Sequence, residues 1–261
     1  MTFFHPELWF LLPVSLIIGI LGMSSGISGS NFWIPVYILW LGIDPHVGFW
    51  LALLTMIFGF GSGVWKNIRQ GTVNWYLVGN YLKFSLPAAI AGAALSGYAP
   101  KNLLLIIFAL FVTGYGGFRL YRSLVSETEP PPAHDRIQWG TAAVAGFLLG
   151  LIATGLGKLI LPTYADHRRI RHHAEAVGTT VVIVFIVNLA ALVSRMNGAL
   201  VQALLDHGQY ILGVLMWVAP GVVAGGQFGP VVARKLSRTH LNLYVAMLLI
   251  LVGVLMMVRA W

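Results

Sequence analysis

The residues of this sequence with the clearest chemical potential gather at two glycine-rich interruptions of apolar segments. The first reads Gly26-Ile27-Ser28-Gly29-Ser30-Asn31 and leads to Pro35, and the second reads Thr154-Gly155-Leu156-Gly157-Lys158 and leads to Pro162. A helix that stops inside a membrane leaves backbone N–H groups without partners, and the N-terminus of the next helix adds a positive dipole end. Glycine lets a ligand approach the backbone, and serine adds hydroxyl donors. The breaks predict a site for an anionic oxygen, formed by Ser28, Gly29, Ser30, Asn31, Gly155 and Gly157; the alternative is that these glycines only permit close helix packing.

Lys158 is the most informative single residue, because it directly follows the second break and has apolar neighbours on both sides. A lysine deep in a bilayer costs about 3 kcal/mol and commonly marks a pathway or a counter-ion. We therefore expect its ammonium to neutralise a transported anion, with snorkelling to an interface as the alternative. Asn31 holds the equivalent position at the first break and could donate through its amide.

Three further polar residues extend the candidate substrate site. Asn80 and Lys83 share one helical face with Pro87, and that face could line the same cavity or lie at a loop end. Thr180 lies within an apolar span, where it could join the site or hydrogen-bond to a neighbouring helix.

Metal and catalytic chemistry find little support in the residues. The run 166–173 (DHRRIRHH) holds three histidines, but its three arginines repel a divalent cation, so it is typical of a solvated loop that could draw anions toward the protein. The chain has no cysteine. An intramembrane enzyme, the alternative from another class, would need paired aspartates, an HExxH motif or a serine–histidine dyad in the spans, and we find none. We predict no metal, no cofactor and no enzymatic activity.

The composition indicates which elements hold these residues. Of the 261 residues, 58% are hydrophobic and 9% are charged, and the mean hydropathy is +0.82. A soluble domain needs a charged surface of roughly a quarter of its residues, so the lipid bilayer must be the solvent and the elements must be membrane helices. The net charge of +8 is an orientation signal of basic loops and does not indicate nucleic-acid binding.

The same order of features occurs twice, which predicts two repeats. Each half has a glycine break, a span, a segment with a central proline (Pro87 or Pro220) followed by small residues every four positions, and a closing apolar helix. We predict a first transmembrane repeat at 1–125, a polar linker at 126–138 and a second transmembrane repeat at 139–261. Each repeat would hold a broken or hairpin segment plus three transmembrane helices, which makes eight to ten membrane segments in total.

Basic residues decide between parallel and inverted repeats. If each first segment crosses once, seven basic residues fall on either side; if each returns as a hairpin, eleven fall on one side and three on the other. The second distribution obeys the positive-inside rule. It predicts inverted topology in a cell (inner) membrane, with the linker in the cytoplasm and both termini outside.

The order and duplication of these motifs resemble the TauE/SafE family of sulfite and organosulfonate exporters. The matching segments are 146–162 (GFLLGLIATGLGKLILP), 175–180 (EAVGTT), 19–35 and 71–75 (GTVNW), and the resemblance covers about residues 12 to 258. It implies export of a small sulfur-containing anion from the cytoplasm; a carrier of small carboxylates is the runner-up, because the same donors would suit them. The chain could act alone or as a homodimer.

The acidic residues bear on how such export would be driven. All eight fall in expected termini, loops or helix ends, whereas proton- and sodium-coupled carriers often bury a carboxylate in the membrane. Export of an anion from a negative-inside cell is favoured by about 2.3 kcal/mol per charge per 100 mV. We therefore predict uncoupled export driven by the membrane potential.

Overall fold

The computed structural model describes residues 5–25, 28–125, 134–235 and 238–261, and every element in these ranges is a helix. The prediction of an all-α polytopic membrane protein is confirmed. Five helices are long and apolar enough to cross a membrane, and two shorter apolar helices accompany them. The elements are η1 Pro6–Leu8, α1 Leu11–Ser25, α2 Ser30–Pro35, η2 Val36–Trp40, α3 Pro45–Arg69, α4 Trp75–Ser96, α5 Lys101–Val125, α6 Trp139–Ile152, α7 Leu156–Tyr164, α8 His173–Ser194, α9 Gly198–Lys235 and α10 Arg238–Ala260.

Both glycine-rich segments lie between helices. The first break separates α1 from α2, although Gly26 and Ile27 lie outside the described residues. The second separates α6 from α7. There Ala153 adopts a left-handed conformation (φ 55°), and Gly155 has φ 109°, a value that side-chain-bearing residues rarely adopt. Gly155 thus lets the chain stop one helix and start the next within three residues.

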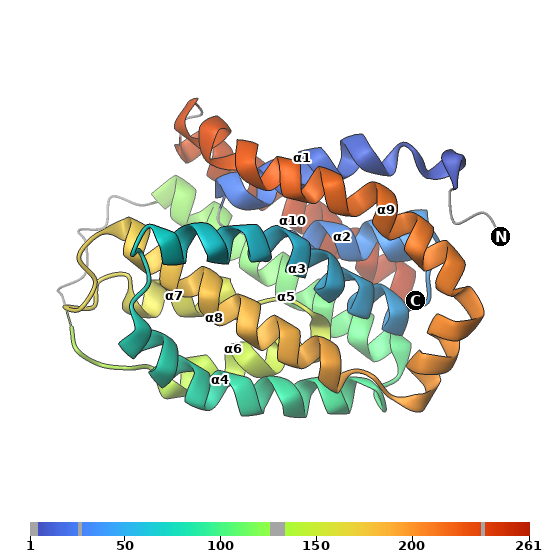
Figure 1. The fold of residues 1–261 in the computed structure, drawn as a ribbon, viewed down its shortest axis with the longest axis horizontal. Coiled ribbons are helices and arrows are strands. Elements are labelled where there is room, and N and C mark those ends of the chain that lie inside the picture. The colour runs from blue at the N-terminus through green and yellow to red at the C-terminus, as the bar shows by residue number, and fades with distance from the viewer. Residues whose placement is uncertain (1–4, 26–27, 126–133, 236–237) are drawn as a thin grey trace.

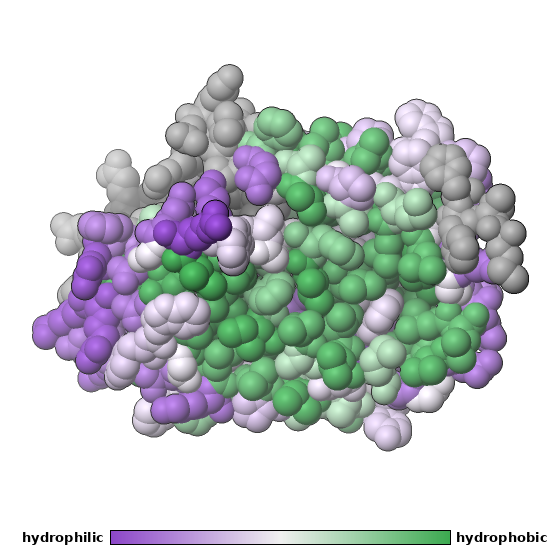
Figure 2. Space-filling view, in the orientation of Figure 1, coloured by the Kyte–Doolittle hydropathy of each residue, from purple (hydrophilic) through white to green (hydrophobic). Residues whose placement is uncertain are grey.

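Polar and apolar residues occupy different parts of the surface along the long axis of the molecule. Both termini lie at one end of the bundle, and α3, α5, α7 and α9 all end at the other (Figure 1). Hydrophilic residues gather at that second end, which we call the linker end, while hydrophobic residues cover the middle of the visible face (Figure 2). Apolar side chains around a bundle are expected where lipid surrounds it.

Helices of one half pack against helices of the other. α1 packs against α9 and α6 packs against α4, so each half contributes one helix to each pair. Glycines allow these close approaches: a Cβ at Gly146 of α6 would overlap the Ser85 carbonyl of α4, and one at Gly225 of α9 would meet the Leu16 carbonyl of α1. The two halves are therefore interlocked.

Corresponding helices of the halves run in opposite directions. Asn188 Nδ2, late in α8, donates to the Leu53 carbonyl, early in α3 (2.8 Å), and Gly178, near the start of α8, packs on the Thr72 carbonyl, just after the end of α3. The colour gradients of α3 and α8 show the same antiparallel course (Figure 1). Helices α5 and α10 also pair with one another, Gly116 lying on Ala246 and Gly253 on Ala109. An inverted repeat would produce this arrangement.

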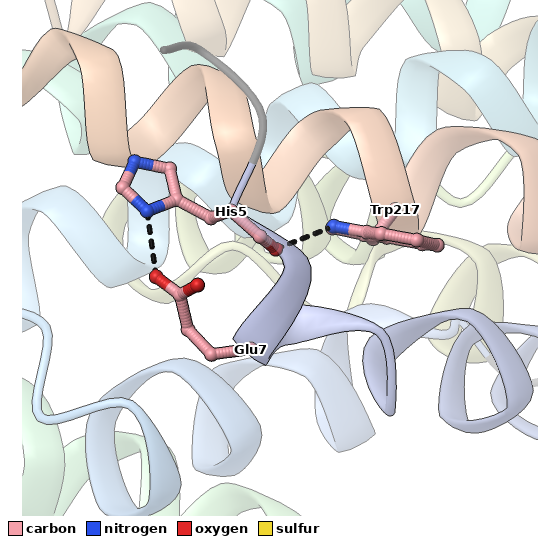
Figure 3. A network of polar contacts seen from close by, with 3 residues as sticks. All are labelled: His5, Glu7 and Trp217. Atoms are coloured by element: carbon pink, nitrogen blue, oxygen red, sulfur yellow. Dashed lines mark hydrogen bonds and ion pairs between the residues drawn. The ribbon is translucent and has the colours of Figure 1, made fainter.

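The segment before α1 is fastened to α9 at the terminal end. Trp217 Nε1 donates to the His5 carbonyl (2.9 Å), and His5 Nδ1 lies 2.7 Å from Glu7 Oε1 (Figure 3). The His5 ring also packs edge-on against Tyr210. Hydrogen bonding by its own backbone and by His5 lowers the pKa of Glu7. These contacts fix the start of α1 along its partner helix.

Candidate functional site

A cavity of about 120 Å³ lies between the two helix breaks. Ser28, Gly29 and Trp33 line it from the first half, and Gly155, Gly157 and Thr180 line it from the second. The other lining residues are apolar or glycine, among them Met56, Leu161 and Val184. A small solute fits it, whereas a drug-sized ligand needs a pocket of roughly 300 Å³ or more.

The N-terminus of α7 faces this cavity, because Gly155 and Gly157 both line it. Gly155 is the N-cap residue, and glycine has no side chain that could accept a hydrogen bond from the first turn. Leu159 N–H donates to the Gly155 carbonyl (3.1 Å), so the N–H groups of residues 156–158 precede the first intrahelical bond. Such a helix start offers donors and a positive dipole end to an anion.

Asn31 and Lys158 contact each other across the two breaks. Lys158 Nζ donates to Asn31 Oδ1 (2.8 Å), and Thr154 Oγ1 donates to the same oxygen (2.7 Å). The Asn31 amide nitrogen donates to the Ser28 carbonyl (2.5 Å). This network joins the first half to the second at the point where both helices are interrupted.

The Lys158 ammonium is buried but does not line the cavity. Only 5% of the residue is exposed, and Nζ lies 5.5 Å from the ring centre of Phe111 and 4.7 Å from that of Tyr115, both on α5. Aromatic faces attract a cation, which offsets part of its desolvation. No salt bridge joins Lys158 to an acidic residue in the described part of the chain. Its charge therefore lies beside the cavity, on the side of α5.

Thr180 is held by a tyrosine, and the first half has the same pair. Tyr164 Oη and Thr180 Oγ1 are 2.5 Å apart, and Thr180 Oγ1 also donates to the Ala176 carbonyl. Tyr37 and Thr55 form the corresponding pair at 2.7 Å. Tyr37 and Tyr164 are separated by the same 127 positions as Asn31 and Lys158. That shared offset is the sequence signal from which the tyrosines could have been predicted.

The structure brings most of the predicted site residues together. Ser28, Gly29, Gly155, Gly157 and Thr180 line the cavity, and Ser30, Asn31 and Lys158 adjoin it; Ser30 Oγ lies 2.8 Å from Ser28 Oγ. Asn80 and Lys83 are elsewhere on α4. Asn80 Nδ2 donates to the Tyr76 carbonyl (2.8 Å), and Lys83 is exposed. Neither residue lines the cavity.

A family model described as "Sulfite exporter TauE/SafE" matches residues 11–256. The chain belongs to the TauE/SafE family. Members of this family are membrane transporters rather than enzymes, so the prediction that the protein is not an enzyme is confirmed, and so is the family resemblance. No curated protein and no solved structure matches the chain. As a TauE/SafE member, the chain is a multi-pass membrane transporter.

Two segments on which the TauE/SafE resemblance rests pack against each other at the linker end. Asn74, from the 71–75 segment, accepts the N–H of Leu77 as N-cap of α4, and its own N–H donates to Thr179 Oγ1 (2.9 Å). Asn74 Nδ2 donates to Glu175 Oε1 (3.3 Å) at the start of α8. A Cβ at Gly178 would overlap the Thr72 carbonyl. The two motifs thus form one junction between the halves.

A buried arginine, Arg195, contacts the end of α6 at the second break, a role that no motif of the sequence indicated. It is 4% exposed, and its Nε and Nη2 donate to the carbonyls of Gly150 (3.0 Å) and Leu151 (2.6 Å). These carbonyls end α6, where a cation also complements the helix dipole. Arg195 therefore holds the last turn of α6 next to the break.

We expect Arg195→Met to cost about 2–4 kcal/mol of stability, because two buried carbonyls of this TauE/SafE protein would lose charged donors. Thermal unfolding of the purified protein in detergent, followed by tryptophan fluorescence, measures the loss. Arg259→Met, which changes an exposed arginine at the same end, is the control. Equal unfolding temperatures for both variants would refute the capping role.

Proposed function

We propose that this transporter exports a small sulfur oxyanion, sulfite or an organosulfonate, which binds in the cavity between the two helix breaks. The proposal rests on the observation that one cavity of about 120 Å³ is lined by glycines of both breaks, Gly29 on one side and Gly155 and Gly157 on the other. A site bounded by both halves can open to either side of the membrane when the halves move relative to one another.

Electrostatics favour an anion in this cavity. The α7 N-terminus directs backbone donors toward it, and the Lys158 ammonium lies beside it in surroundings of low dielectric constant, where a charge acts over a longer distance than in water. None of the described acidic residues is buried. An anion would thus meet positive potential and no buried carboxylate.

The direction of export follows from the distribution of charge. We place the linker end, with its basic loops, in the cytoplasm, the linker 126–138 inside the cell and both termini outside. The repeats 1–125 and 139–261 then have inverted topology, which the antiparallel course of α3 and α8 supports. With no buried carboxylate among the described residues to couple a proton or Na⁺, the membrane potential drives the anion outward.

Flux into proteoliposomes tests the proposal. We expect sulfite and a small alkanesulfonate to move under an imposed membrane potential without a pH gradient, and acetate to move more slowly. Flux of acetate alone would replace the substrate class with small carboxylates. A requirement for a proton gradient would overturn the uncoupled mechanism.

We expect Lys158→Met to weaken sulfite binding by roughly tenfold or more, because it removes the buried positive charge next to the cavity. A thermal-shift titration of purified protein with sulfite measures this. Lys83→Met is the matched control, since Lys83 is the other lysine of the predicted site but lies exposed on α4. If Lys83→Met weakened binding and Lys158→Met did not, the substrate site would lie along α4.

A further inference from the structure

A pair of histidines joins the end of the linker to the loop between α7 and α8. His134 N–H donates to the Asp166 carbonyl (3.2 Å), and Arg168 N–H donates to the His134 carbonyl (3.0 Å). The side chains of His134 and His167 then meet edge to face, with ring centres 5.9 Å apart. We call His134 and His167 the histidine pair; it lies at the linker end, away from the central cavity.

Each ring of the histidine pair buries a nitrogen that has no hydrogen-bond partner in the described structure, namely His134 Nδ1 and His167 Nε2. His167 is only 3% exposed. Its Nδ1 accepts the N–H of Arg169 (3.1 Å), so in the neutral ring the proton must be on Nε2. His167 Nε2–H is therefore a buried donor that lacks an acceptor, a costly arrangement that proteins rarely keep without a ligand or a water.

The fixed proton on His167 decides which kind of ligand fits. A metal ion needs the Nε2 lone pair, which would move the proton to Nδ1, directly against the Arg169 N–H. An acceptor has no such conflict. Arg168 and Arg169 follow His167 in the chain. Arg168 Nη1 forms an ion pair with Asp135 Oδ2 at 3.3 Å. The donor and the adjacent arginines both favour a ligand that accepts hydrogen bonds and carries negative charge.

We propose that the histidine pair is a second binding site for a small oxyanion, which accepts hydrogen bonds from His167 Nε2–H and from His134 Nδ1–H. The ligand class is a compact anion with several oxygens, either the transported anion or a free inorganic oxyanion such as phosphate. Because the site lies where the linker meets the α7–α8 loop, an anion bound there also ties these two segments together. The inference rests on the proposed function only where the ligand is the transported anion.

Binding at this site depends on pH in a defined direction. Burial lowers the pKa of His167, with His134 and Arg169 acting in the same direction and Asp135 opposing them. A bound anion favours the protonated ring, so it raises this pKa. For an anion of constant charge, binding therefore tightens as the pH falls through the pKa of His167, and the anion-free contact loses stability over the same range because the unfolded chain binds the proton more readily.

Nitrogen NMR of the full-length protein, labelled at histidine and held in detergent micelles, tests the proposal. The His167 resonances are assigned with His167→Gln, and their pH titration is recorded in gluconate, in sulfite and in phosphate. We expect a higher His167 pKa in sulfite or phosphate than in gluconate, and roughly tenfold weaker sulfite binding at this site in His134→Phe. Sulfite alone would identify the transported anion as the ligand, and an equal effect of phosphate would identify a general oxyanion site.

Two outcomes would overturn the second site. His167 resonances that ignore both anions would mean that a water satisfies the rings, and a response to Zn²⁺ without a response to either anion would mean a metal site. Gly157→Leu, which fills the central cavity, separates the two proposals. If Gly157→Leu leaves sulfite transport unchanged while His167 still responds to the anions, the proposed function is wrong and the second site stands.

Discussion

Replacing Gly157 with leucine is expected to reduce sulfite flux in proteoliposomes to the level of protein-free vesicles. A Cβ at this position would point between Val184 and Thr180, 3.3 and 3.5 Å from their methyl carbons. A leucine side chain would continue into the cavity and take up space that the anion needs. Leucine also favours a helix over glycine by several tenths of a kcal/mol, so α7 itself should not be weakened.

Gly114→Leu is the matched control for the cavity-filling variant. Gly114 is a helical glycine of α5 that is exposed, and a Cβ there would meet nothing within 4 Å. This variant should transport like the wild type. Unchanged flux in Gly157→Leu, with the protein folded by tryptophan fluorescence, would show that the anion does not pass through this cavity.

Gly150→Leu should be the most destabilising of these single substitutions, with a loss of at least about 3 kcal/mol. A Cβ at Gly150 of α6 would overlap the Ala89 carbonyl and press on the Ala93 N–H of α4. Because the obstacle is backbone, no side-chain rotation can relieve it, and α4 and α6 would have to separate. Thermal unfolding in detergent, monitored by tryptophan fluorescence, measures the effect.

Gly140→Leu, ten residues earlier in α6, is the control for this crossing. A Cβ at Gly140 would meet nothing within 4 Å, and the residue is exposed. We expect its unfolding temperature to stay near that of the wild type. If Gly150→Leu unfolded at the same temperature as Gly140→Leu, the close α4–α6 contact would not contribute to stability.

The break positions and the basic end could be predicted because they depend on local signals. Glycine and proline favour the end of a helix, and arginines in loops stay on one side of a membrane. The contacts that side chains make around each break were harder to predict. Lys158 points toward Phe111 and Tyr115 of α5, and nothing local to residue 158 indicates which distant helix supplies these rings.

The buried face of α4 is marked in its sequence more clearly than the shared spacing of Asn80, Lys83 and Pro87 suggests. Leu77, Tyr81, Ser85 and Ala89 recur every four residues and are all buried, so they form the stripe that faces the protein. Lys83 lies two positions from Tyr81 and Ser85, which turns it to the other side of the helix. Spacing relative to the proline does not reveal which side of a helix is buried, whereas this stripe does. A part for Asn80 and Lys83 in the site stays a prediction.

The contact between Asn31 and Lys158 has a consequence for charge stoichiometry. The two residues occupy corresponding positions, 127 apart, and they meet each other directly. Two identical copies of one half, assembled around the same centre, would place either two lysines or two asparagines there. Two lysines would repel each other, and two asparagines would carry no charge. A single fused chain can differ at this one pair, so it places one lysine opposite one asparagine where the two halves meet.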